Sequence, residues 1–326
     1  MNNRRKLLVA LGAGALAWAT HTRAQPKAAK VARIGILHPT SASSTRGNFE
    51  ALRSGLRDLG YVEGKNLVIE RRWADGKYER FNELAAELVR LKVDVIVTTG
   101  TPGTQAAKQA TTTIPIVMAA SGDPVAAGLV ASLARPGGNV TGLAIFGPEI
   151  HAKRLELLRE AMPRLRRVGI LRNVDNSGND TKGLEQAAKA LNLELQQFGV
   201  RGPDEFNSAF SEMSKQRIDA VVVLDDAMLN YNVKGTAELA AARRLPSAGN
   251  PTFAEAGGVI GHGISQVGVW RRAATFVDKI LKGAKPADLP IERATTFDLV
   301  INMKMAKALG ITIPQSILVR ADKVIE

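Results

Sequence analysis

RIGIL at residues 33–37 returns as RVGIL at residues 167–171, 134 positions further along the chain. Both are short apolar runs of the kind that forms buried β-strands. A second match joins FNELAAELVRLKVDVIV, which begins at residue 81, to FNSAFSEMSKQRIDAVVV, which begins 125 positions later. The unit also ends alike, because LPSAGNP at 245–251 corresponds to IPIVMAASGDP at 114–124. These three matches in one order predict two copies of a single structural unit.

Within each copy, apolar runs alternate with amphipathic segments such as 49–60, whose apolar residues share one helical face and which Gly60 ends. This alternation predicts an α/β protein with two Rossmann-like lobes, each a parallel sheet flanked by helices. Ligands bind such sheets beyond the carboxyl ends of the strands. Two facing lobes would therefore enclose a cleft and close on a small molecule.

The composition excludes several kinds of chemistry. The chain has 326 residues, enough for two domains, and no cysteine, so disulfides, thiol nucleophiles and iron–sulfur clusters are absent. The net charge is +13, but the basic residues are scattered over helix faces without an arginine-rich tract. This pattern favours a solvated basic surface over a nucleic-acid partner.

The first 24 residues predict a cleaved export signal. A basic start that includes Arg4 and Arg5 precedes an apolar run at 7–19, and Thr22 and Ala24 supply small residues before the cleavage point. Both the Sec and the twin-arginine routes are compatible with this segment, and a retained anchor is the alternative. The G-x-G-x-x-A pattern at 12–17 follows no strand, so it does not indicate a dinucleotide site. We expect a periplasmic protein.

Helix starts at strand ends are candidate anion sites. Thr101, Asp123 and Asn250 each stand before a proline, as an N-cap residue before the first helical position does. Free backbone N–H groups and the helix dipole favour a carboxylate there. Thr101, Gly103 and Thr104 form the best cradle, although ordinary helix capping is the alternative.

Polar loops after other strands are candidate ligand contacts. The first strand runs into a loop rich in hydroxyl groups, with Thr40, Ser41 and Ser43. In the second copy, the strand-end loops supply Asn173, Asp175, Asn176, Asp225 and Asp226, where a carboxylate could hold a ligand amine. Helix capping or exposure to solvent is the alternative for each.

Catalytic motifs are missing. The sequence has no G-x-S-x-G, no phosphate loop and no H-E-x-x-H. His38, His151 and His262 stand far apart without a third metal ligand at useful spacing. We therefore expect neither an enzyme nor a cofactor. Trp73 and Trp270 could stack on an aromatic ligand, with packing in the core as the alternative.

Three stretches resemble the substrate-binding proteins of bacterial ABC transporters with the type I periplasmic fold. They are GLRDLGYVEGKNLVIERRWADG at 55–76, GDPVAAGLVASLARPGGNVTG at 122–142 and the long segment RRAATFVDKILKGAKPADLPIERATTFDLVINMKMAKALGITIP at 271–314. The resemblance covers almost the whole chain after the signal. It is strongest to the branch that includes tryptophan- and tyrosine-type binders.

The resemblance implies a hinge that the chain crosses three times. Lobe 1 would comprise 31–145 and 265–288, and lobe 2 would comprise 146–264 and 289–326. It also implies a small polar or amphipathic ligand such as an amino acid or an aromatic carboxylate, an ABC permease in the inner membrane as partner, and a monomer. A sensory domain of the same fold is the first rival function, and an enzyme on this scaffold is the second.

The resemblance assigns roles to some residues. A Ser or Thr at the lobe-one helix start contacts the ligand carboxylate, which matches Thr101 and Ser121, and Asp225 is the candidate amine contact. Phe146, Trp270 and Phe253 are the candidate stacking rings. The complete set of expected ligand-binding residues is Thr40, Ser41, Ser43, Gly100, Thr101, Thr104, Ser121, Asp123, Asn173, Asp175, Asp225 and Asn250.

Overall fold

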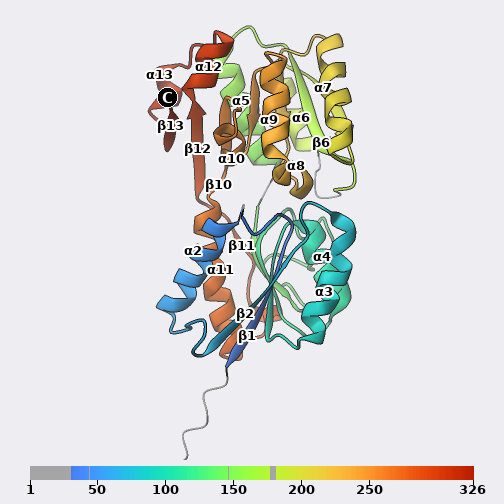
Figure 1. Ribbon diagram of the computed structural model, residues 1–326, viewed down its shortest axis with the longest axis vertical. Coiled ribbons are helices and arrows are strands. Elements are labelled where there is room, and N and C mark those ends of the chain that lie inside the picture. The colour runs from blue at the N-terminus through green and yellow to red at the C-terminus, as the bar shows by residue number, and fades with distance from the viewer. Residues whose placement is uncertain (1–30, 44, 146, 177–180) are drawn as a thin grey trace, which may run out of the picture. The chain divides into compact units, whose positions relative to one another are not determined.

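The computed structural model describes residues 31–43, 45–145, 147–176 and 181–326 (Figure 1). The expected export signal and Phe146 lie outside the described residues. One folded unit extends from Ala32 to Glu326, and its described strands form two sheets.

The first sheet has the strand order β11-β5-β4-β3-β1-β2, and all of its neighbouring strands are parallel. Its strands are β1 (Ala32–His38), β2 (Leu67–Trp73), β3 (Val95–Thr99), β4 (Ile116–Ser121), β5 (Val140–Ala144) and β11 (Glu292–Arg293).

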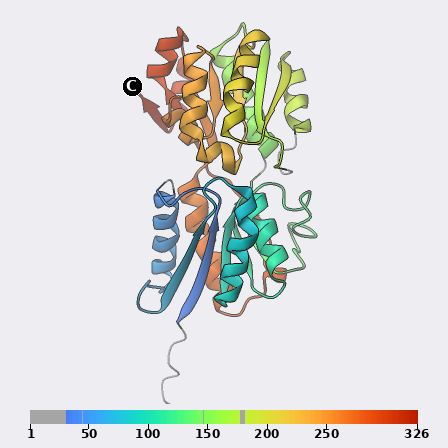
Figure 2. The same ribbon diagram turned by 45° about the vertical axis from the view of Figure 1, so that its right-hand side comes forward.

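Helices cover both faces of the first sheet. Its helices are α2 (Arg46–Asp58), α3 (Phe81–Arg90), α4 (Thr101–Ala110) and α11 (Gln266–Leu281), with short 3₁₀ turns η1 (Tyr78–Arg80) and η3 (Pro286–Asp288). The blue α2 and the orange α11 lie side by side and bury one face of the strands (Figure 1). The opposite face packs against α3 and α4 (Figure 2). Apolar residues alternate along β1, so that Ile34 and Ile36 enter one core and Leu37 enters the other.

The second sheet has the order β13-β12-β10-β9-β8-β6-β7, and β12 is antiparallel to β10. Its strands are β6 (Arg167–Asn173), β7 (Glu194–Val200), β8 (Ala220–Val223), β9 (Ser247–Gly249), β10 (Ile260–Ile264), β12 (Phe297–Asn302) and β13 (Lys323–Ile325).

One face of the second sheet packs against helices α5 (Gly147–Ala161), α6 (Lys182–Ala190), α12 (Met303–Leu309) and α13 (Gln315–Leu318). The other face packs against α7 (Phe206–Lys215), α8 (Ala227–Tyr231), α9 (Val233–Ala242) and α10 (Pro251–Glu255), and the 3₁₀ turn η2 (Pro203–Glu205) precedes α7. Two mostly parallel sheets flanked by helices confirm the predicted fold class.

The two copies seen in the sequence are equivalent in the structure. The order β4-β3-β1-β2 in the first sheet matches β9-β8-β6-β7 in the second. Asp94 and Asp219, which the sequence paired, make the same contact: each carboxylate accepts a hydrogen bond from the backbone N–H of the first strand, from Arg33 and from Arg167, at 2.8 Å. Each aspartate therefore fixes the start of its third strand against its first.

The shared glycine of RIGIL and RVGIL allows a helix layer to pack closely on the sheet. A Cβ atom at Gly35 would lie 3.0 Å from Leu88 Cδ2 and 3.2 Å from Val93 Cγ2. A Cβ atom at Gly169 would lie 3.2 Å from Ile218 Cγ2 and from a ring atom of Phe198. Larger residues would overpack both cores at equivalent points.

The chain passes between the sheets three times: from β5 to α5, from β10 to α11, and from β11 to β12. The last passage corrects the lobe boundary expected at residue 288. Glu292 and Arg293 pair with Leu143 and Ala144 of β5, so this segment still belongs to the first sheet. Without β11, β5 would be an open edge of the sheet with unpaired backbone groups. Pairing with β11 satisfies these groups, which explains why the chain leaves the first lobe after residue 293 and not at residue 288.

We expect Gly35→Val and Gly169→Val each to lower the free energy of unfolding by about 1–3 kcal/mol, because both added side chains would overpack a core. Urea denaturation at pH 7 measures this change. Gly47→Ala in α2 is the control, since no atom lies within 4 Å of its added Cβ. Unchanged stability of both valine variants would contradict the close packing.

Candidate functional site

A cavity of about 410 Å³ lies where the strands of both sheets end. The first lobe contributes the loops after β1, β3 and β4 and the start of α11. The second lobe contributes α5 and the loops after β6, β8, β9 and β10. This is where open α/β sheets bind ligands, and the volume falls in the usual range for small-molecule sites, roughly 300–1,000 Å³. The predicted residues that line the cavity are Thr40, Gly100, Thr101, Asp225 and Asn250.

The start of α4 forms part of the first-lobe wall. Gly100, and not Thr101 as expected, is its N-cap residue, with a φ of 77°, a conformation that favours glycine. Thr101 is therefore the first helical residue. Thr101 is buried, and its Oγ1 lies 3.4 Å from Ser121 Oγ. The first-turn N–H groups of a helix have no partner within that helix, and the dipole makes this end positive. An anionic ligand group would therefore be favoured at Thr101.

Other predicted first-lobe residues serve local structure instead of lining the cavity. Thr104 is buried beneath the helix start, where its hydroxyl bonds Thr98 Oγ1 at 2.8 Å and the Gly100 carbonyl at 2.9 Å. Asp123 accepts hydrogen bonds from the next turn, from the N–H groups of Val125 and Ala126 at 2.9 and 3.0 Å. The helix expected to start after Asp123 is a turn in the structure, and Asp123 stabilises that turn.

Ser41 and Ser43 lie on an exposed part of the loop after β1, with their hydroxyl oxygens 3.0 Å apart. In the second lobe, Asp175 is exposed, and its backbone N–H donates to Asn173 Oδ1 at 3.0 Å. None of these residues is among those that line the cavity, and neither is Ser121. Of the predicted residues in the hydroxyl-rich loop, Thr40 alone lines the cavity, where Thr45 at the end of the loop joins it.

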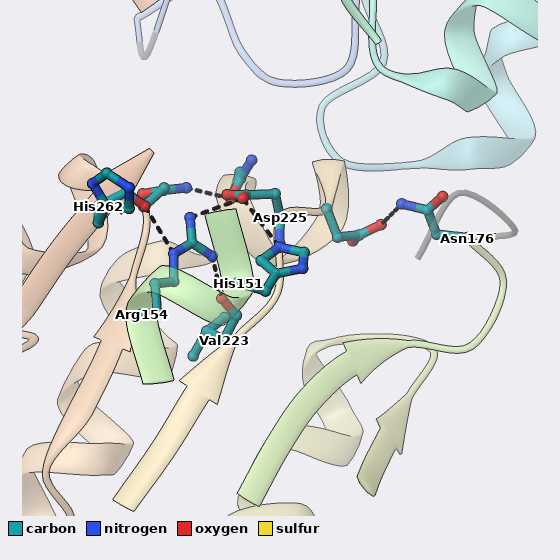
Figure 3. Close-up of polar contacts among 9 residues, drawn as sticks. His151, Arg154, Asn176, Val223, Asp225 and His262 are labelled. Carbon is teal, nitrogen blue, oxygen red and sulfur yellow. Dashed lines mark hydrogen bonds and ion pairs between the residues drawn. The ribbon is translucent and has the colours of Figure 1, made fainter. Parts of the chain in front are cut away.

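Arg154 organises the second-lobe wall, although the sequence did not single it out (Figure 3). Its guanidinium is fully buried and donates to Asp225 Oδ2 at 2.8 Å, to the His262 carbonyl at 2.8 Å and to the Val223 carbonyl at 3.0 Å. These contacts join α5 to the end of β8 and to the middle of β10. The sequence did contain a sign of this role, because the arginine stands among Ile150, Leu155 and Leu158 on the apolar side of α5, where a charged residue is rare unless it is paired.

Asp225 is an ionised carboxylate at the cavity. Burial raises the pKa of this carboxyl, but Arg154 and then His151 lower it, and the resulting pKa is about 2. The ring Nε2 of His151 lies 3.3 Å from Asp225 Oδ2 (Figure 3). Burial lowers the pKa of His151, so this imidazole is neutral at pH 7. Arg154 is therefore the cation that compensates Asp225.

Asp226 links the two lobes. Its buried carboxylate caps α8 by accepting from the N–H groups of Met228 and Leu229 at 2.9 and 3.0 Å. Asn176 donates to it at 3.0 Å, and the hydroxyl of Tyr78 donates to it from the first lobe. Of the two neighbouring aspartates, only Asp225 has a cation beside it among the described residues.

The rings expected to stack on a ligand are core residues. Trp270 is fully buried between His38 and Phe49, with ring centroids 5.4 and 5.9 Å away. Phe253 packs beneath Gly249 in the core of the second lobe. The packing alternative thus describes both. Among the described residues, the aromatic side chains that line the cavity are Tyr78, Phe81, His38 and His151.

His38 ends β1 as a buried neutral ring. The Thr40 N–H donates to His38 Nδ1 at 3.2 Å, which leaves the ring proton on Nε2. Burial lowers the pKa of this imidazole to about 3. The cavity wall beside α4 is therefore polar but uncharged.

Comparison with known proteins decides the family. A family model described as "ABC transporter substrate binding protein" matches residues 33–325. The chain belongs to this family. Its proteins are extracytoplasmic, bind small molecules and work with an ABC permease. In the described part of the chain, every helix is too short or too polar to span a membrane.

Several relatives share most of this substrate-binding protein. A "Tyrosine-binding protein" of Clostridioides difficile is 30% identical over 275 residues, which cover 83% of this chain and 78% of the relative. A structure from Streptococcus pneumoniae, described as an ABC domain in complex with L-Trp, is 30% identical with a TM-score of 0.82. A conserved domain protein from Vibrio cholerae is 31% identical with a TM-score of 0.84. Each solved structure covers 90% of this chain and is itself covered completely.

We expect Arg154→Met to lower the free energy of unfolding by about 3–5 kcal/mol at pH 7, because it leaves Asp225 buried without a cation. The loss should shrink toward pH 3 as the unpaired carboxyl takes up a proton. Chemical denaturation measures both effects. Adding Asp225→Asn should restore part of the stability, whereas Lys153→Met, on the same helix but exposed, is the control. An equal loss of stability in Arg154→Met and Lys153→Met would contradict the stabilising role of the pair formed by Arg154 and Asp225.

We expect acid to destabilise the protein through His38. The unfolded imidazole binds a proton below about pH 6.5, whereas the folded one does so only at about 3. The unfolded state therefore binds more protons between these values, and stability falls as the pH falls, by up to about 1.4 kcal/mol per pH unit. His38→Phe should remove this part of the slope in urea titrations from pH 7 to pH 4. A slope identical to that of the parent protein would contradict it.

Proposed function

We propose that this protein is the periplasmic receptor of an ABC importer and that its ligand is an α-amino acid. One observation carries the proposal: the start of α4 in one lobe and the Asp225 carboxylate in the other line the same cavity. These are the two poles that a zwitterion needs. An aromatic carboxylate without an amine would leave the second pole unused.

The ligand carboxylate would lie at the start of α4. The positive helix end and the N–H groups of the first turn favour an anion there, and the Thr101 hydroxyl can donate to it. The ligand ammonium would lie at Asp225, whose low pKa keeps the carboxylate charged. Arg154 holds this carboxylate from behind, so its orientation is fixed before the ligand arrives.

The body of the ligand would lie against an apolar part of the cavity. Its lining there includes Phe81, Ile145, Ile150, Ile264 and Val267. The relatives described as binding tyrosine and L-Trp support an amino acid with an extended side chain. Closure around it would follow from tighter binding to the closed form, since equal affinity for both forms shifts nothing.

The test is binding of the twenty standard amino acids to the exported protein by thermal shift, followed by calorimetry on those that bind. Thr101→Val should weaken binding about tenfold, since it removes a hydrogen bond to a charged group. Asp225→Asn should weaken it more, because it removes a full charge. Thr112→Val, exposed beyond the end of α4, is the matched control.

Two outcomes would contradict the proposal. Binding of no amino acid by a folded protein would exclude the ligand class. Equal affinity in Thr101→Val and Thr112→Val would remove α4 from the site. For the importer role, deletion of the protein should abolish cellular uptake of the bound amino acid, and the permease should be retained on the immobilised, loaded protein.

A further inference from the structure

The acidic residues around the cavity all belong to the second lobe. The chain has 44 lysines and arginines against 31 acidic residues, yet no basic side chain is among the described residues that line the cavity. The first-lobe wall has no ionised group, since His38 is neutral. The second-lobe wall has four acids: Asp225, Asp226, Glu255 and Asp298.

Two of these acids have a cation beside them. Arg154 lies 2.8 Å from Asp225, and Lys323 lies 2.6 Å from Glu255. Neutral donors alone surround Asp226, namely the α8 backbone, two asparagines and Tyr78. These donors stabilise its charge without cancelling it.

Asp298 differs from the other three acids. It lies on β12 opposite Gly263 of β10, next to the third passage between the lobes. Its side chain is half-buried, and within the described ranges it has neither an ion pair nor a side-chain hydrogen bond. A carboxylate in such a position lacks part of its hydration and has no protein partner in exchange.

We propose that the ligand is a net cation, an amino acid whose side chain carries a second positive charge, and that Asp298 is the specificity-determining contact for that charge. This inference rests on the proposed function, which supplies the first two poles. A neutral zwitterion balances the start of α4 and Asp225 but leaves the charges of Asp226 and Asp298 unopposed. A second cation on the ligand opposes the charge of Asp298 in the cavity, where charge interactions are stronger than in bulk water.

The experiment compares ligands that differ by one charge at nearly constant shape. L-arginine is compared with L-citrulline, and L-lysine with L-norleucine, by calorimetry at pH 7 and low salt. The cationic member of at least one pair should bind about tenfold or more tightly than its neutral counterpart. Asp298→Asn should reduce this ratio to less than threefold while leaving the affinity for the neutral member unchanged.

Asp204→Asn is the matched control, because it removes one charge from an exposed position on η2, remote from the cavity-lining set. It should leave the ratio unchanged. Asp298→Ser serves as a second variant of different shape. A ratio near one in the parent protein overturns the inference, and so does a ratio that survives both Asp298 variants.

Failure of the inference differs from failure of the proposed function. Binding of neutral amino acids alone would overturn the inference and leave the function intact. Binding of agmatine, which is arginine without its carboxylate, in preference to arginine would support the cationic pocket and remove the carboxylate pole at α4. Binding of no arginine, lysine or agmatine overturns the inference whatever the neutral amino acids do.

Discussion

A guanidinium without access to water holds one wall of the ligand cleft together. Arg154 donates to the carbonyl group of Val223 at the end of β8 and to that of His262 within β10, and its third hydrogen bond fixes Asp225. A buried cation needs all of these partners, since each missing one would leave charge or a polar group without compensation. The positions of the two strand ends and the protonation state of Asp225 thus depend on one side chain. The first lobe has no equivalent, and its wall is shaped by a helix start and neutral groups.

The fold could be predicted from the sequence because repeats and the alternation of strands with helices are local patterns, and each corresponds to a definite arrangement of the chain. RIGIL and RVGIL mark first strands in equivalent sheets, and Asp94 and Asp219 have equivalent contacts. The lobe boundary failed for the opposite reason. β11 is two residues long, and a strand that short has no periodicity. Only its pairing with β5 shows to which lobe it belongs.

The site was less predictable because side-chain direction is not a local property. A polar residue before a proline predicts a helix start, which is confirmed for α4 and α10 but not at Asp123, where the chain forms a turn. Whether a helix start faces the cleft depends on tertiary packing. Thr101 lines the cavity, whereas Asp123 only caps its own turn. Trp270 looked like a surface for an aromatic ligand, yet the return of α11 to the first lobe buries it. Arg154 and Asp298 stood within ordinary helix and strand patterns, and their roles follow from neighbours distant in sequence.

The threefold passage between sheets has a consequence for the order of folding. The core of the first lobe contains β1 near the beginning of the chain and Trp270 from α11 near its end. As the chain emerges from the ribosome or from an export channel, this lobe cannot close before residue 293 has appeared. The second lobe likewise waits for β12 and β13. Both lobes therefore complete their cores only after most of the chain has been made, because each core includes segments from late in the sequence.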